Sequence, residues 1–268
     1  MTYRMRSLLL PLLFTCVLAS CGDPGVTDTG ATAELPDDYP ADTETVDDTV
    51  AIHPVFHAST ALTRGEMTVL VDPYNGAGRY TDFGTPDLVL ITHTHPDHMD
   101  TATLNGLDLS AATLVAPQAV LDALGENTFA STVALANGED FTFDGVNISA
   151  VPAYNPPPKD NFHPKGKFNG YVITMDKERY YFSGDTEGVD EMRALEDIDY
   201  AFVCMNLPYT MDVEQAASAV IDFAPRVVYP YHYRNQDETK SDIARFRQLV
   251  QAERPDTEVR IENWYPAK

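Results

Sequence analysis

The segment that most constrains this chain is the histidine-rich turn between His93 and His98. Three of the seven histidines of the protein, His93, His95 and His98, lie in it, together with Asp97. Imidazole nitrogens and carboxylate oxygens are the usual protein ligands of zinc and similar metals. The turn follows the apolar run 87–92, which predicts a buried strand. A strand that leads into a ligand-dense turn can place several ligands around one point, so the sequence predicts a metal site here.

Two other apolar segments end in a residue of the kind that binds metals. One run leads into Asp185 and another leads into His232. If these strand ends meet at one edge of the fold, their side chains converge on the histidine-rich turn. His163 lies in a loop rich in Pro and Asn, so no regular element fixes its position. Cys204 sits inside an apolar run and is predicted to be a buried side chain rather than a ligand or nucleophile.

The N-terminal residues predict export rather than part of the fold. Residues 1–20 combine two early arginines with an apolar run too short to span a bilayer comfortably, and they resemble a lipoprotein signal peptide. Cys21 follows small residues and is expected to carry the lipid, although an ordinary signal peptide with an incidental cysteine is the alternative. Residues 21–50 are acidic and contain no Lys or Arg, so we expect a disordered tether. The globular domain is then expected over residues 51–268.

The charge of the chain excludes one broad class of partner. The protein has 41 acidic and 18 basic residues and a formal net charge of −23. Such a surface repels phosphate backbones, so we expect no nucleic-acid partner. The expected partners are a small-molecule substrate and a membrane that is reached only through the lipid anchor, and the oligomeric state is left open. We expect a cell-envelope protein facing the periplasm or the exterior, and Gly22 after the lipidated cysteine favours the outer membrane over the inner one.

Strand and helix signals interleave along the globular part of the chain. We predict strands over 67–71, 88–92, 113–116, 171–175, 179–183, 226–229 and 258–264, short strands near Val133, Phe141 and Ile148, and helices that begin near Thr101, Pro117, Asp212 and Ser241. Asp100 is the predicted N-cap of the first of these helices. Because hairpin signals occur among the helices, the pattern favours two mixed sheets packed together with helices on the outside, an α+β architecture.

Taken in chain order, these motifs resemble the metallo-β-lactamase superfamily. The resemblance is carried by His-x-His-x-Asp-His at 93–98, a loop histidine at 163, Ser-Gly-Asp-Thr at 183–186 and a strand-terminal histidine at 232. Local segments such as 163–166 and 230–233 are similar to its UlaG-like branch, which includes ascorbate-phosphate lactonases and has phospholipases D as relatives. The resemblance implies the four-layer αβ/βα sandwich of the metallo-β-lactamase fold.

The resemblance also implies a dinuclear zinc site, with Mn²⁺ or Fe²⁺ as alternative metals. It assigns one metal to His93, His95 and His163, the other to Asp97, His98 and His232, and the bridging position to Asp185. A hydroxide between the two metals would attack a carbonyl or phosphorus centre, with Asp97 and Asp185 as the catalytic carboxylates. The histidine at position 95 favours zinc, since related diiron proteins tend to carry glutamate there.

Several other polar residues are candidates for supporting roles. Asp72 ends a strand before a proline and is expected either to orient a ligand histidine or to form a turn. Tyr154, Asn155 and Tyr209 lie in loops expected near the metals, so they are candidates to support a metal ligand, contact substrate or donate to an oxyanion. The histidines of the first strand, His53 and His57, are expected to be packed or hydrogen-bonded.

Two functions are compatible with this sequence. The first is a hydrolase that cleaves a small ester, a lactone or a phosphoester, with β-lactams disfavoured because the local segments depart from that branch. The second is a membrane-tethered lipoprotein that binds metal without catalytic turnover. The complete ligand set favours the hydrolase, because relatives that lose activity usually lose ligands.

Overall fold

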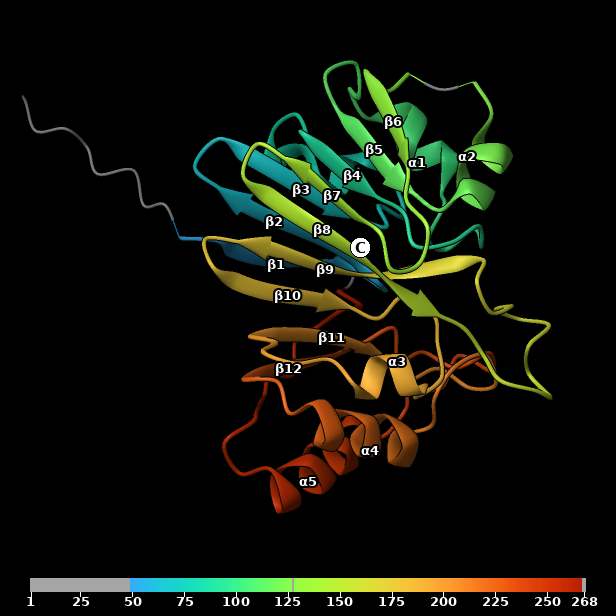
Figure 1. The fold of residues 1–268 in the computed structure, drawn as a ribbon, viewed down its shortest axis with the longest axis vertical. Helices are drawn as coiled ribbons and strands as arrows, with labels where there is room; N and C mark the ends of the chain where they lie inside the picture. Colours follow the sequence, from blue (N-terminus) through green and yellow to red (C-terminus); the bar gives the residue numbers. More distant parts are fainter. Residues whose placement is uncertain (1–48, 127, 267–268) are drawn as a thin grey trace, which may run out of the picture. The chain divides into compact units, whose positions relative to one another are not determined.

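The computed structural model describes residues 49–126 and 128–266 of the chain. The predicted signal peptide, Cys21 and most of the predicted tether lie outside the described residues. Within this part, the strands form one 6-stranded and one 7-stranded sheet, and helices lie beside each of them (Figure 1). None of the helices in the described ranges is both long enough and apolar enough to cross a bilayer.

The first sheet is built from the N-terminal half of the domain. Its strands, in spatial order, are β1 (Ala51–Phe56), β2 (Ser59–Arg64), β3 (Met67–Val71), β4 (Leu88–Leu90), β5 (Thr113–Ala116) and β6 (Ser131–Ala134). The first three strands pair antiparallel, and β3 to β6 pair parallel. Its connections contain η1 (Ala77–Arg79), η2 (Thr81–Phe83), α1 (Thr101–Gly106) and α2 (Gln118–Leu124).

The second sheet is built from the C-terminal half. Its strands, in spatial order, are β13 (Glu258–Val259), β12 (Val227–Tyr231), β11 (Tyr200–Cys204), β10 (Glu178–Phe182), β9 (Phe168–Met175), β8 (Val146–Ala153) and β7 (Asp140–Phe143). Strands β7 to β10 are antiparallel neighbours, and β10 to β13 run parallel. The helices of this half are α3 (Asp190–Arg193), α4 (Val213–Phe223) and α5 (Ile243–Glu253).

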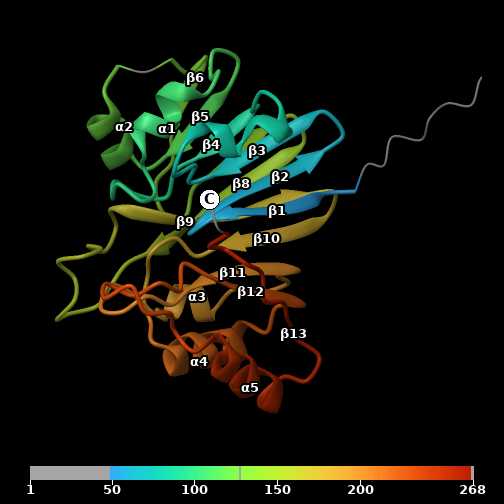
Figure 2. The same ribbon diagram turned by 180° about the vertical axis from the view of Figure 1, so that it is seen from behind.

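The alternation of side chains along β4 explains why the molecule has four layers. Leu88 and Leu90 belong to the core between the two sheets, whereas Val89 and Ile91 belong to a second core under α1 and α2. Successive strand residues point to opposite faces, so a strand that is apolar at every position must be covered on both sides. Figure 2 shows α4 and α5 on the outer side of β12 and β13, away from the first sheet. This arrangement is the predicted αβ/βα sandwich.

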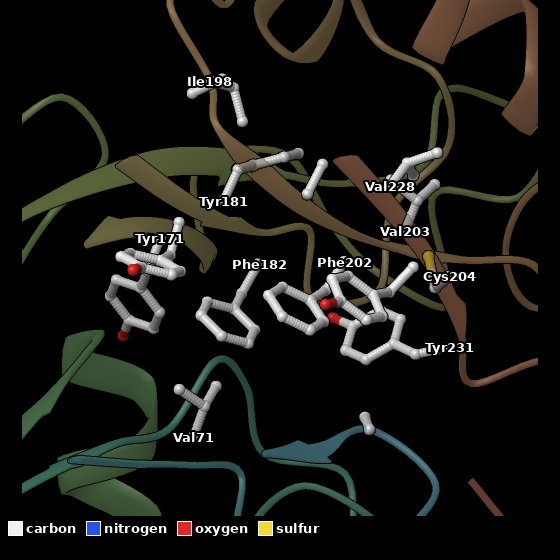
Figure 3. Close-up of a cluster of buried hydrophobic side chains, with 14 of the residues drawn as sticks. Val71, Tyr171, Tyr181, Phe182, Ile198, Phe202, Val203, Cys204, Val228 and Tyr231 are labelled. Carbon is white, nitrogen blue, oxygen red and sulfur yellow. The ribbon is translucent and has the colours of Figure 1, made fainter. Parts of the chain in front are cut away.

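Aromatic side chains fill the region between the sheets (Figure 3). The in-register parallel pairing of β10, β11 and β12 sets Phe182 beside Phe202 and Phe202 beside Tyr229. Their rings stack, with centroids 4.3 Å apart for the first pair and 4.8 Å for the second. Each buried aromatic ring contributes about 1.5–3 kcal/mol through its removal from water. The ladder therefore stabilises the register of the strands whose ends carry Asp185 and His232.

Most of the predicted elements are confirmed. Asp100 caps α1 by accepting from the backbone N–H groups of Ala102 and Thr103, and Cys204 is fully buried. The strand predicted over 258–264 is wrong beyond Val259. The chain leaves the sheet there, because the carbonyl of Trp264 accepts a hydrogen bond from the backbone N–H of His57 (3.0 Å), at the end of the other sheet's first strand.

Candidate metal centre

Polar residues follow five strands and meet at one edge of the sandwich. They are His57 after β1, Asp72 after β3, His93 after β4, Asp185 after β10 and His232 after β12. Three of them, His57, Asp72 and His232, have φ angles of 61°, 45° and 45°. L-residues rarely adopt this left-handed region, which costs on the order of 1–3 kcal/mol where the surrounding structure enforces it. Such conformations cluster at functional sites.

One group of potential ligand atoms surrounds the first predicted metal position. One ligand atom each from His93, His95, His163 and Asp185 lies within 4.8 Å of the others. The Nε2 of His93 is 3.1 Å from the Nδ1 of His95, and the Nε2 of His163 is 3.4 Å from the Oδ2 of Asp185. Three imidazoles and one carboxylate are a donor set that suits zinc.

A second group lies on the other side of Asp185. The Oδ1 of Asp185 is 3.3 Å from the Nε2 of His98 and 3.4 Å from the Nε2 of His232. The Oδ2 of Asp97 is 3.4 Å from the Nε2 of His232 and 4.0 Å from the Nε2 of His98. The structure therefore brings all seven predicted ligands together. Asp185 directs one oxygen at each group, as the position of a bridging carboxylate requires.

Unpaired buried atoms at the centre fit this donor set. Side-chain atoms of four residues are buried without a hydrogen-bond partner, namely Nε2 of His98, Nε2 of His163, both ring nitrogens of His232 and Oδ1 of Asp185. Leaving a buried polar atom unsatisfied costs about 1–3 kcal/mol. The three Nε2 atoms and the Asp185 oxygen face the two groups described above, so cations bound between them would satisfy these four atoms. The residues present fit two divalent ions.

The electrostatics of the cluster follow from burial and close packing. Burial alone would raise the pKa of Asp185, but the neighbouring His232 and His98 hold it well below the usual range. Burial, reinforced by His98, lowers the pKa of His93, which keeps that imidazole neutral and able to bind a cation. For His98, burial is outweighed by the carboxylates of Asp185, Asp72 and Asp97, which raise its pKa.

Asp72 orients His98 through a contact with the Nδ1 of that histidine. Its Oδ2 lies 2.7 Å from the Nδ1 of His98, while its two oxygens accept hydrogen bonds from the backbone N–H (2.8 Å) and hydroxyl (2.7 Å) of Thr92. With the Nδ1 engaged, the Nε2 of His98 is directed toward Asp185. Of the two roles expected from the sequence, the structure places Asp72 in the orienting one, and its positive φ shows that it also turns the chain.

Asn155 fixes the position of His163 through contacts that the sequence did not indicate. The Oδ1 of Asn155 lies 2.7 Å from the Nδ1 of His163, and its backbone N–H donates to the carbonyl of the same histidine. The side-chain NH₂ of Asn155 donates to the carbonyl of Tyr209 at 2.7 Å. Both Asn155 and His163 are buried. Of the roles expected for Asn155, the structure therefore favours the one that orients a candidate ligand over contact with substrate.

His57 belongs to the site, although the sequence did not identify it as a site residue. Its Nε2 lies 3.1 Å from the Oδ2 of Asp97, and its Nδ1 lies 3.0 Å from the hydroxyl of Tyr265. Its ring is also 3.8 Å from the ring of His232, and its carbonyl accepts the backbone N–H of that residue. His57 is hydrogen-bonded, as expected, but in a turn after β1 and against a candidate ligand. Burial, with a smaller contribution from His232, lowers the pKa of His57 to about 4.

A cavity of about 400 Å³ opens beside the cluster. Asp97, Asp185 and His232 line one wall, and Tyr209 lines another. Among the described residues, the hydroxyl of Tyr209 has no hydrogen-bond partner, so it is available to a substrate. Tyr154 does not line this cavity: its hydroxyl donates to Glu191 and accepts from Lys165. The prediction that Tyr154 contacts substrate stays a prediction, and its backbone bonds to Thr186, next to Asp185, agree with the alternative of a supporting role.

Two mixed sheets in an αβ/βα sandwich, with ligand-bearing strand ends at one edge, define the metallo-β-lactamase fold. The profile of the β-lactamase superfamily domain matches residues 52–232, which include the whole cluster. The chain belongs to this superfamily.

Known proteins with similar sequences and structures agree with this placement. The chain is 31% identical over 196 residues to a UPF0173 metal-dependent hydrolase of Pyrococcus horikoshii, covering 69% of this chain and 86% of that protein. A UPF0173 metal-dependent hydrolase of Thermococcus onnurineus is 32% identical over 194 residues, with coverage of 69% and 86%. A crystal structure from Parabacteroides distasonis, described as a metal-dependent hydrolase, superposes with a TM-score of 0.70 at 36% identity, covering 80% of this chain and 92% of that one.

Proposed function

We propose that this protein is a dinuclear, zinc-dependent hydrolase that cleaves a small ester, a lactone or a phosphoester. The observation that carries the proposal is the position of Asp185, whose two oxygens face separate groups of imidazoles at 3.3–3.4 Å. The names of its relatives as metal-dependent hydrolases support the general activity. The UlaG-like segments at 163–166 and 230–233 support the lactone and phosphoester classes.

The proposed chemistry divides between the cations and the side chains that hold them. Two divalent cations bound here would make hydroxide available near neutral pH and polarise the oxygen that gains negative charge. Asp97 lines the cavity and keeps 36% of its side chain exposed. Despite burial, His98, His232 and His57 lower the pKa of Asp97, so its carboxylate stays ionised and can orient an attacking water. Tyr209 is placed to donate a hydrogen bond to substrate.

Zinc is the proposed metal because of the composition of the first group. The three imidazoles of His93, His95 and His163 meet a single carboxylate there. A glutamate at position 95 would add a second negative charge and a harder ligand, which favours iron. Elemental analysis of the purified protein, after reconstitution with an equimolar mixture of Zn²⁺, Mn²⁺ and Fe²⁺, tests this part. Preferential retention of iron would contradict it.

A hydrolysis panel tests the proposed activity. Wild-type protein is compared with Asp97→Ala and Asp185→Asn on a lactone, an aryl ester and a bis-aryl phosphodiester. We expect wild-type turnover of at least one class and a loss of about 100-fold or more in both variants, because each removes a carboxylate at the reacting centre. Absence of wild-type activity on all three classes would favour the alternative of a metal-binding protein without turnover.

We also propose that Cys21 carries a lipid that tethers the domain to the cell envelope, with the outer membrane as the favoured location. The support is the sequence around Cys21, which lies outside the described residues. Expression of the full chain with a labelled fatty acid, compared with Cys21→Ala, tests it. Label should follow the wild-type protein into the membrane fraction and be absent from the variant. Equal labelling of the two proteins would refute the anchor.

A further inference from the structure

A group of cations surrounds two aromatic rings at one rim of the cavity. We call this group, formed by Arg79, Arg234 and Lys240, the cationic rim. The guanidinium of Arg234 lies 4.1 Å from the ring centroid of Tyr265, and the ammonium of Lys240 lies 5.2 Å from the same centroid. The guanidinium of Arg79 lies 4.6 Å from the ring centroid of Phe56. Phe56 and Arg234 both line the cavity.

This gathering stands out because the protein as a whole is strongly acidic. The sequence has 18 basic and 41 acidic residues. Among the described residues, Arg79 and Lys240 form no ion pair, and Arg234 has a single one, to Glu238 at 3.4 Å. The side chain of Glu238 is 78% exposed, and so exposed a pair is weak. Most of the five N–H donors of the Arg234 guanidinium therefore stay available.

Arg234 is held close to the candidate metals by the chain itself. It lies two residues after His232, and its backbone N–H donates to the hydroxyl of Tyr265 at 3.1 Å. That hydroxyl also contacts the Nδ1 of His57, which in turn contacts Asp97. Arg234 and the metal cluster therefore share one set of contacts, and both line the same cavity of about 400 Å³.

Other cavity residues add neutral donors beside Arg234. The Oδ1 of Asn206 accepts from Thr210 at 2.6 Å, and within the described part of the chain its NH₂ group has no acceptor. The side chain of Gln236 likewise has no hydrogen-bond partner there. Free N–H donors around an arginine are a recognition surface for carboxylate or phosphate oxygens.

We propose that the cationic rim binds an anionic group of the substrate, a carboxylate or a phosphate, while the scissile bond lies at the metals. Arg234 is the primary contact, with Asn206 and Gln236 as neutral donors and Arg79 and Lys240 as sources of positive potential. This inference rests on the proposed function and narrows its substrate to molecules with an anion separated from the bond that is cleaved.

Binding of paired carboxylates tests the subsite without requiring turnover. A monocarboxylate such as butyrate can engage the metals or Arg234 but not both, whereas succinate, glutarate and adipate can engage both at once. Calorimetry on the metal-loaded protein should show that at least one dicarboxylate binds about 10-fold or more tightly than butyrate, the gain expected from a charge-assisted hydrogen bond. The same series with phosphonate-terminated acids distinguishes phosphate from carboxylate recognition.

Substitutions of Arg234 test whether the cationic rim causes the preference for a dicarboxylate over butyrate. Arg234→Gln should reduce the difference between the best dicarboxylate and butyrate to less than about 3-fold, while Arg234→Lys should retain part of it. Arg226→Gln is the matched control, since this exposed arginine pairs with Glu178 and Asp199 and does not line the cavity. An unchanged dicarboxylate preference in Arg234→Gln, or no preference in wild type, would overturn the proposal. A preserved preference without turnover on any ester supports the subsite and counts against the hydrolase.

Discussion

Replacement of His57 should weaken the second metal selectively. The Nε2 of this histidine lies 3.1 Å from the Oδ2 of Asp97, and the Tyr265 hydroxyl at 3.0 Å from Nδ1 fixes the ring. A hydrogen bond to a charged group contributes about 1.5–3 kcal/mol, and the loss of such an outer contact usually weakens a metal about 10- to 100-fold. We therefore expect His57→Ala to lower the affinity for the second zinc by that factor and to leave the first zinc unchanged.

Competition with a chromophoric chelator measures both affinities in one titration. His57→Gln should fall between wild type and His57→Ala, because its amide can still donate to Asp97. His53→Ala is the control: His53 lies in β1, the strand that ends just before His57, and its Nε2 contacts Thr63 at 2.8 Å, outside the cavity. Two zinc ions bound by a folded His57→Ala protein with wild-type affinities would refute this reasoning.

Three further predictions concern the stability of the fold, its dependence on pH and the affinity for metal. Gly170→Ala should lower the free energy of unfolding in urea by about 1–3 kcal/mol, because an added Cβ would lie 2.7 Å from the carbonyl oxygens of Phe182 and Ser183. Gly78→Ala is the control and should leave the free energy of unfolding nearly unchanged, since nothing lies within 4 Å of its added Cβ. The metal-free protein should lose thermal stability as pH rises above 6.5, since the folded pKa of His98 is raised above that value: its contribution is complete below 6.5 and is lost as pH rises through the folded pKa. A thermal midpoint that climbs steadily over the alkaline range would contradict this. Asp72→Asn should weaken the second zinc about 10- to 100-fold by chelator competition, as it removes the carboxylate that holds His98, and unchanged affinity would argue against the orienting role.

The fold and part of the ligand set were largely predictable because they depend on local patterns. Strands form within the apolar runs at 88–92 and 227–231 and lead into polar residues, and parallel strands that end at one edge bring those residues together. The histidine spacing between 93 and 98 then narrows the chemistry to metals. The place of His163 among the ligands, and the division of the ligands between two metals, came only from the resemblance to the metallo-β-lactamase superfamily.

The supporting contacts were not predictable because they join residues through irregular segments. Residues 55–64 contain no Gly, Pro or Asn, so nothing in the sequence marks the turn at His57, where φ is 61°. Asn155 reaches His163 across a loop whose conformation no periodicity determines. The departure of the chain from the sheet after Val259 likewise depends on the contact between Trp264 and His57, which lies far away in sequence.

Anomalous diffraction from crystals of the zinc-loaded protein would show whether the centre holds two metals. We expect two peaks roughly 3.5–4 Å apart, on opposite sides of the Asp185 carboxylate. One peak should contact His93, His95 and His163, and the other should contact Asp97, His98 and His232. A single peak, or zinc bound away from Asp185, would contradict a dinuclear centre.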